Sequence, residues 1–214
     1  HFPATHVLAT GSSSLSASAR FGDTLTGRKE EIWLTPMVLA DLADFGSADL
    51  DRRLLRGGLP SFFLAGELPE RDFQEWMDGY WSKDILELFR LRERHAFLRF
   101  VELMLLNSGG MFEATRYARP CEVSRTTIAN YLQVLESTFV AHVIRPYAER
   151  RRSEIVSAPK VYAFDTGFVA YFRGWQSLRP EDRGALWEHL VLNELQAHLP
   201  AGARVAYWRS KHGN

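Results

Sequence analysis

The sequence predicts a mainly α-helical protein of the α+β class with small β elements, and three observations lead to this prediction. Apolar residues recur at helical spacing, for example at Phe73, Trp76, Met77 and Tyr80. Only a few short apolar or alternating runs, such as residues 140–147 and 161–164, are typical of strands. The 214 residues, 46% hydrophobic and 24% charged, supply enough apolar material for a packed core.

The charge balance and the cysteine content limit the classes of function that this protein can have. The 26 basic and 26 acidic residues balance, so attraction to a nucleic acid or a membrane would need a local patch. A single cysteine, Cys121, excludes an intrachain disulfide framework and suits a reducing cytoplasm. The histidines lack metal-ligand spacing, so no metal site is predicted. With no apolar run of about 18 residues, we expect a cytoplasmic protein without a membrane partner.

Residues 95–164 predict a winged helix. Helices are expected over 95–108, 112–119 and 125–136, the last with Ser124 as its N-terminal cap. Strands over 140–147 and 161–164 would bracket an arginine-rich hairpin tip. Between Arg116 and Lys160 there are eight basic and four acidic residues, a local charge of +4. This order of helices and hairpin, with its local charge, favours contact with DNA.

Two groups of residues are the candidates for that contact. Arg125, Thr126 and Thr127 open the second helix of the pair, where a recognition helix meets bases or phosphates. The hairpin tip is suited to the DNA backbone and carries Arg150, Arg151 and Arg152. The alternative is a structural winged helix with a solvated hairpin. We expect any binding to be weak, largely without sequence preference and dominated by phosphate contacts.

The chain contains no Walker A motif. Gly22 and Gly27 have the right spacing, but Arg28 and Lys29 stand where Lys and Ser or Thr are needed. A run typical of a strand, 31–34, follows in place of a helix. A polar residue of the Thr10-Gly11-Ser12 turn, at the end of an expected strand, could instead orient water against a nucleotide phosphate. Such small residues also serve turn geometry alone.

Taken in order, several motifs resemble prokaryotic AAA+-type ATPases, in which an AAA_14 P-loop NTPase module precedes a DUF4143 domain. They include residues 8–14, similar to a sensor-1 strand and turn, and Gly57-Gly58-Leu59-Pro60. Residues 160–167 resemble a K-x-Y-x-x-D-x-G signature. The resemblance implies a fragment whose Walker A and Walker B would precede His1. It also implies ATP and magnesium as cofactors of the parent protein, none in this fragment, and a possible homo-oligomer.

The resemblance also assigns regions and residues. Residues 1–36 would be the C-terminal edge of the ATPase core, 37–94 a helical lid region, 95–164 the winged helix and 165–214 the start of a DUF4143-type α/β domain. Thr10 and Ser12 become sensor-1 candidates. Arg28 becomes a candidate arginine finger or sensor, with a structural ion pair as its alternative role.

The function expected from sequence is the C-terminal part of an ATP-binding protein, an ATPase, with a winged helix that can contact DNA. The fragment alone is expected to be inactive, because it lacks a Walker A motif. Two alternatives remain open. One is a stand-alone winged-helix DNA-binding regulator. The other is a restriction-endonuclease-like nuclease, in which Glu188 would join metal-binding carboxylates located beyond Asn214.

Overall fold

The computed structural model describes residues 8, 10–11, 32–67, 70–85, 89, 93–147, 158–200 and 202–208. Its helices and strands are, in order, α1 (Leu39–Asp44), α2 (Leu50–Arg56), α3 (Pro60–Leu64), α4 (Glu70–Gly79), the π-helix η2 (Tyr80–Ile85), α6 (Arg94–Leu106), α7 (Ala114–Ala118), α8 (Arg125–Ser137), β1 (Ala141–Ile144), β2 (Lys160–Ala163), α10 (Thr166–Phe172) and α11 (Pro180–His198). The predicted class, mainly α with small β elements, is confirmed.

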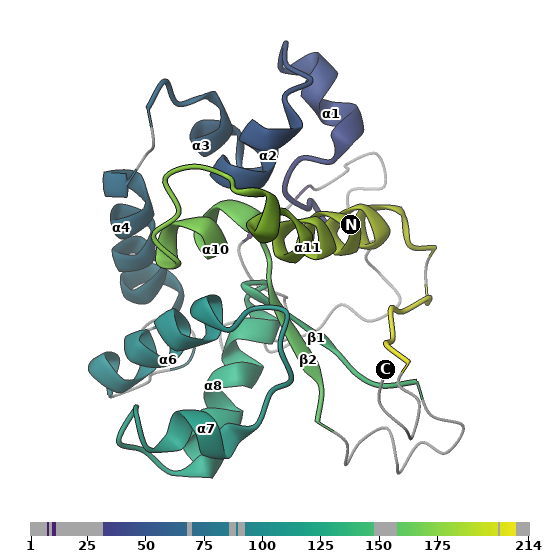
Figure 1. The fold of residues 1–214 in the computed structure, drawn as a ribbon. Helices are drawn as coiled ribbons and strands as arrows, with labels where there is room; N and C mark the ends of the chain where they lie inside the picture. The colour runs from purple at the N-terminus through teal and green to yellow at the C-terminus, as the bar shows by residue number, and fades with distance from the viewer. Residues whose placement is uncertain are drawn as a thin grey trace, which may run out of the picture.

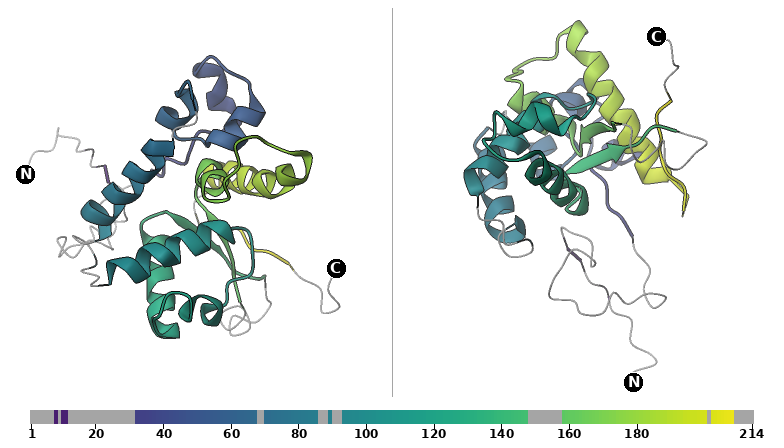
Figure 2. Two further views of the ribbon diagram at one scale, coloured as in Figure 1. Left: turned by 60° about the vertical axis from the view of Figure 1, so that its left-hand side comes forward. Right: turned by 90° about the horizontal axis from the view of Figure 1, so that it is seen from below.

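Helix α10 lies at the centre of the arrangement. In Figure 1 it lies between α1–α3 above it and α6–α8 with the strand pair below it, and the left-hand view of Figure 2 shows the same order. Its Phe168 is almost fully buried and packs against four aromatic rings from three other segments: Phe62 of α3, Phe73 and Trp76 of α4, and Phe164 after β2. One aromatic core therefore joins the upper and lower helices.

The contact between α2 and α10 depends on glycine. Gly57 ends α2 at φ +88°, and a Cβ there would lie 2.7 Å from the carboxyl carbon of Asp165. A Cβ at Gly167 would lie 2.6 Å from the carbonyl carbon of Arg56. Asp165 caps α10 by accepting from the Gly167 N–H at 2.8 Å, and it also accepts from the Gly58 N–H at 2.6 Å. These glycines let the two helices meet through their backbones.

The lower part of the molecule runs from α6 through β2. Strands β1 and β2 pair antiparallel, with Ala141 opposite Ala163 and Ile144 opposite Lys160. The segment before α7 lies along the other edge of β2, where Met111 bridges Lys160. The Gly109 N–H donates to the Val161 carbonyl at 2.8 Å in the same place. The predicted helices of this region are present, although α7 is shorter than the predicted 112–119.

Some predicted strands are wrong. Residues 32–34 are irregular where a strand was predicted over 31–34, and Ile32 and Leu34 are 78% and 86% exposed. An apolar run alone does not make a strand without a partner for its backbone groups. Leu8 and Thr10, in the predicted first strand, are irregular as well. Residues 205–208 run beside the chain that follows β1, where the Tyr207 N–H donates to the Arg145 carbonyl at 3.1 Å.

Among the described residues, no helix combines the length and apolar character required to cross a bilayer. The division of the chain at residues 36, 94 and 164 stays a prediction.

Candidate nucleic-acid interface

Helix α8 has one buried face and one exposed face. The buried face packs against the core and consists of Ile128, Tyr131, Leu132, Val134 and Leu135. The other face is exposed and consists of Arg125, Thr126, Ala129, Asn130 and Gln133. Residues 126, 129, 130 and 133 have the spacing that places side chains on one side of a helix. This face carries polar groups, one arginine and one carboxylate, that of Glu136, which is paired with Arg145 at 3.4 Å.

The N-terminus of α8 is built as the sequence predicts. The Ser124 hydroxyl accepts from the Thr127 N–H at 3.0 Å and lies 2.9 Å from the Thr127 hydroxyl. Such a cap stabilises a helix by about 1 kcal/mol. Thr127 is therefore engaged within the cap, whereas Arg125 and Thr126 are exposed beside it. Arg125 makes no ion pair with any described residue, so its charge is available to a ligand.

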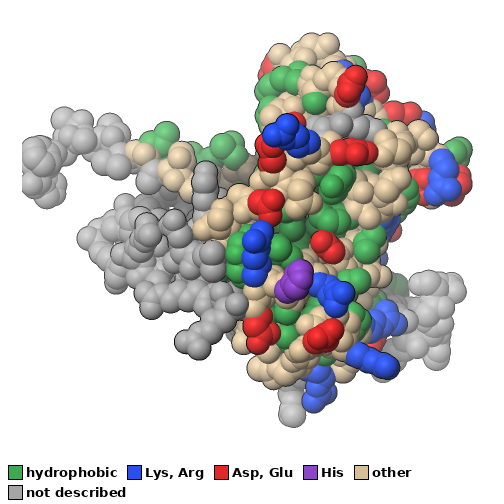
Figure 3. All heavy atoms as spheres, turned by 90° about the vertical axis from the view of Figure 1, so that its left-hand side faces the viewer, with side chains coloured by type: hydrophobic (Ala, Val, Ile, Leu, Met, Phe, Trp, Pro, Cys, Tyr) green, Lys and Arg blue, Asp and Glu red, His purple; other side chains and the backbone are tan. Residues whose placement is uncertain are grey.

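Three arginines and three glutamates lie within residues 113–136, which include α7 and most of α8. Figure 3 shows Lys and Arg side chains towards the lower end of the molecule, and Arg116, Arg119 and Arg125 are exposed. The neighbouring carboxylates are paired: Glu113 with Arg116 at 3.7 Å, Glu122 with Arg99 at 3.7 Å and Glu136 with Arg145 at 3.4 Å. Exposed pairs of this kind add little stability, but they neutralise charge that would repel phosphate.

Of the remaining predicted site residues, the structure describes Thr10 alone. Arg150, Arg151 and Arg152 lie outside the described residues, as do Ser12 and Arg28. Thr10 is described and exposed, and no contact within the described part of the chain involves it. The roles assigned to these six residues stay predictions.

Two histidines are buried at the strand pair, His142 on β1 and His189 on the neighbouring helix α11. His189 on α11 approaches the Ala185 carbonyl with Nδ1 at 2.6 Å and the Ser108 hydroxyl with Nε2 at 2.6 Å. A neutral ring with its proton on Nδ1 satisfies both partners, because the Ser108 hydroxyl can then donate to Nε2. His142 on β1 is also buried, and its Nε2 has no partner among the described residues. Burial lowers the pKa of each histidine to about 4.

Acid is therefore expected to destabilise the fold before its carboxylates titrate. Both histidines have a folded-state pKa of about 4, below the value of roughly 6.5 in an unfolded chain. The unfolded state then binds more protons, so stability is full above about pH 6.5 and falls as the pH drops towards 4. Each histidine contributes a loss on the order of 3 kcal/mol. Urea unfolding between pH 4.5 and 7.5 measures this loss.

His142→Phe should flatten that pH dependence, because it removes one of the two groups that must be protonated. His95→Phe, at an exposed position of α6, is the control and should leave the dependence unchanged. An equal acid loss in the wild type and in His142→Phe would contradict the assignment.

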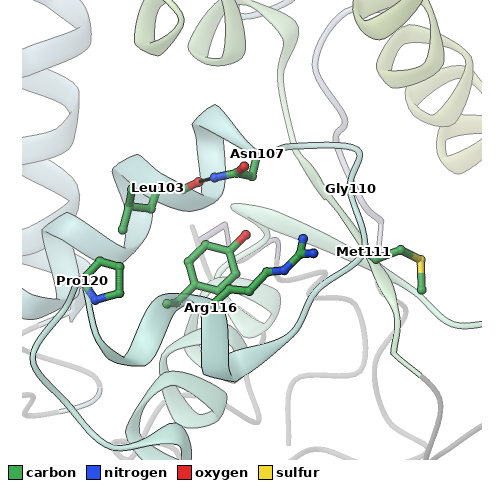
Figure 4. A pocket seen from close by; sticks show the side chains of 7 residues that line it. Leu103, Asn107, Gly110, Met111, Arg116 and Pro120 are labelled. Atoms are coloured by element: carbon green, nitrogen blue, oxygen red, sulfur yellow. Dashed lines mark hydrogen bonds between the residues drawn. The ribbon is translucent and has the colours of Figure 1, made fainter.

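A pocket of about 270 Å³ lies between α6 and α7. Figure 4 shows Asn107 and Arg116 among its lining residues, with the Asn107 amide folded back to donate to the Leu103 carbonyl at 2.7 Å. Arg116, the one charged residue that lines it, is paired with Glu113 at 3.7 Å. The lining thus lacks the acid–base pair that catalysis commonly uses.

Glu188, the acidic residue of the nuclease alternative, takes part in a small network between α11 and β2. It accepts from the Tyr162 hydroxyl at 3.1 Å and lies 3.9 Å from the Lys160 ammonium. Within the described ranges, no group of three or more His, Cys, Asp or Glu side chains is placed to hold a metal ion. Its observed partners make Glu188 a link between two elements.

These observations define a mainly helical α+β protein in which α8 exposes a polar face beside a small antiparallel sheet. The family described as a domain of unknown function, DUF8612, matches residues 47–179, more than half of the chain. The chain therefore belongs to this family.

Relatives are found in several bacteria. The chain is 32% identical over 213 residues to uncharacterized proteins of Mycobacterium bovis and Mycobacterium tuberculosis, covering 95% of this chain and 47% of each relative. It is 23% identical over 206 residues to an uncharacterized protein of Haemophilus influenzae, covering 89% of this chain and 51% of the relative. The chain thus spans about half the length of these relatives. No solved structure matches it.

The resemblance to ATPases with an AAA_14 module and a DUF4143 domain is therefore wrong, because the family that matches is a different one. Two of the motifs behind it have a structural explanation. Gly57-Gly58 and the Asp165-x-Gly167 pair are the residues that let α2 and α10 approach closely. A short glycine motif can therefore be required for close helix packing, and its presence does not by itself indicate the ATPase family.

Sequence reasoning missed part of the exposed face of α8. It identified Arg125, Thr126 and Thr127 at the start of the helix, but not Asn130 and Gln133 further along. The signal was present, since both residues lie between the apolar positions of the helix, on the side opposite its buried stripe.

Proposed function

We propose that this chain binds duplex DNA, with α7 and α8 as a helix-turn-helix and the β1–β2 pair as the base of a wing. The observation that carries the proposal is the exposed face of α8, which is polar and contains Arg125, and whose one carboxylate, Glu136, is paired with Arg145 at 3.4 Å. The order of elements supports it. Helix α6, a short extended segment at Met111, α7, α8, β1 and β2 follow one another as in a winged helix.

The dimensions and charge of α8 suit this function. The major groove of B-DNA admits an α-helix, and a recognition helix presents its N-terminal residues to it. Arg125 and Thr126 occupy that end of α8, and the free backbone N–H groups of the first turn favour a phosphate. On the side of α8 opposite its exposed face, the buried side chains of Ile128, Tyr131 and Leu135 pack against the core and fix the helix in place. A rigid helix with a free polar face requires little rearrangement on binding.

The other expected functions have less support. A role of the longer protein in ATP hydrolysis would depend on Thr10, Ser12 and Arg28, of which Ser12 and Arg28 lie outside the described residues. The nuclease alternative would require carboxylates near Glu188, which instead contacts Tyr162 and Lys160. A stand-alone regulator and a DNA-binding part of a longer protein would both use the same face of α8.

The test is a fluorescence-anisotropy titration of the chain with a labelled duplex of about 20 base pairs at several salt concentrations. Wild type should bind at low salt, and its affinity should fall steeply with salt. Arg125→Ala should weaken binding to all duplexes alike and reduce the slope of log affinity against log salt by about one unit.

Arg71→Ala is the matched control, since Arg71 is an exposed arginine on α4, paired with Glu75 at 2.7 Å. It should leave affinity and slope unchanged. Absence of binding by the wild type at low salt, or equal effects of the two substitutions, would reject the proposal.

A further inference from the structure

We propose that α8 reads adenine bases in the major groove through the side-chain amides of Asn130 and Gln133. The inference rests on the proposed function and adds sequence specificity to a surface that the amino-acid sequence alone suggested would contact phosphates. Its ligand is a duplex site with A·T pairs at the positions that α8 faces.

The two amides lie together on the exposed side of α8. They are three residues apart, which separates them by about 4.5 Å along the helix axis and by about one sixth of a turn around it. Both are exposed, and neither makes a hydrogen bond with a described residue. The amides of Gln74 and Gln196 are likewise without a hydrogen bond to a described residue, whereas those of Asn107 and Asn193 donate to backbone carbonyls and that of Gln176 donates to Glu70. Asn130 and Gln133 therefore keep both the donor and the acceptor of the amide free.

An amide matches adenine better than the other bases. Adenine presents the N7 acceptor and the N6 amino donor side by side in the major groove, and Asn or Gln can bond to both at once. Guanine presents two acceptors there, and the edge of cytosine presents an amino donor. A carboxylate on the same face would favour cytosine, but Glu136, one turn further along, is paired with Arg145 at 3.4 Å.

The side chains next to Asn130 are also suited to the recognition of A·T pairs. Ala129, beside Asn130, and Thr126, one turn before it, each offer a methyl group that can contact the methyl group of thymine. From Thr126 to Gln133 the helix rises about 10 Å, which corresponds to about three base pairs. We therefore expect a preferred core of about three consecutive positions, rich in A·T pairs, for each bound chain.

The experiment selects binding sites from a duplex library with a randomised centre, using the 214-residue chain. Wild type should enrich A·T pairs within a short core. A duplex with this core should bind about tenfold or more tightly than one in which the core A·T pairs are exchanged for G·C, since each bidentate contact discriminates by such a factor.

Asn130→Ala combined with Gln133→Ala should reduce that preference to near unity, and the salt dependence of binding should stay the same because neither side chain is charged. Alanine is the best helix former, so these exposed substitutions preserve α8. Circular dichroism checks that they do. Gln74→Ala is the matched control, because Gln74 is an exposed amide on α4, and it should retain the full preference.

The outcomes separate the two proposals. Duplex binding without A·T enrichment, or with enrichment that survives the double substitution, overturns the adenine inference and leaves DNA binding standing. If the wild type binds no duplex at low salt, the proposed function fails, and the inference fails with it.

Discussion

Gly167→Ala is expected to destabilise the protein severely. The new Cβ would lie 2.6 Å from the carbonyl carbon of Arg56 and 2.9 Å from the backbone nitrogen of Gly57. Both atoms belong to the backbone, so no side-chain rotation can relieve the clash, and α2 and α10 would have to separate. Overpacking a core contact costs about 3 kcal/mol at its upper end, and a backbone clash belongs there. Urea unfolding followed by circular dichroism measures the loss.

Gly184→Ala is the control for this substitution. Gly184 is exposed in α11, and a Cβ there would meet no heavy atom within 4 Å. Alanine in a helix interior is more favourable than glycine by about 1 kcal/mol, so this variant should be slightly more stable than the wild type. Equal unfolding midpoints for Gly167→Ala and the wild type would show that α2 and α10 are not locked together through their backbones.

The helices were predictable because their signals are local. The apolar spacing of α8 and the hydroxyl of Ser124 lie within a few residues of each other, and both work in the structure as expected. The antiparallel pair β1–β2 was also predictable from alternation and flanking turn residues. The strand expected over 31–34 was not, because a strand depends on a distant partner that local pattern cannot supply.

The candidate site was predictable only in part. Arg125 and Thr126 were identified from their place at the start of a helix, and the structure shows both exposed. The meaning of Gly57 and Gly167 was misjudged, because their contact joins segments about 110 residues apart. Until the fold places α2 against α10, a glycine that permits close approach looks the same as one that shapes a nucleotide-binding loop.

The same junction holds a buried pair of opposite charges, Arg53 and Asp165, which are 1% and 3% exposed. The Asp165 carboxylate accepts from two backbone N–H groups, and Arg53 donates to the Met37 carbonyl at 2.8 Å and to the Thr166 hydroxyl at 3.0 Å. Asp165→Ala should therefore cost on the order of 3 kcal/mol, because it removes the largest of the charges that offset the buried guanidinium, to which Glu194 and Asp41 also contribute. It also removes the N-terminal cap of α10.

A double-mutant cycle separates the charge effect from the loss of the cap. Arg53→Met removes the guanidinium but keeps an apolar side chain, so combining it with Asp165→Ala leaves neither charge buried alone. The double variant should lose at least about 1 kcal/mol less than the sum of the two single losses, as expected for groups that share one network. Strict additivity in urea unfolding would mean that Asp165 acts only through its bonds to the backbone. In that case Asp165→Asn, which keeps a carbonyl acceptor at the cap, should restore most of the stability lost in Asp165→Ala.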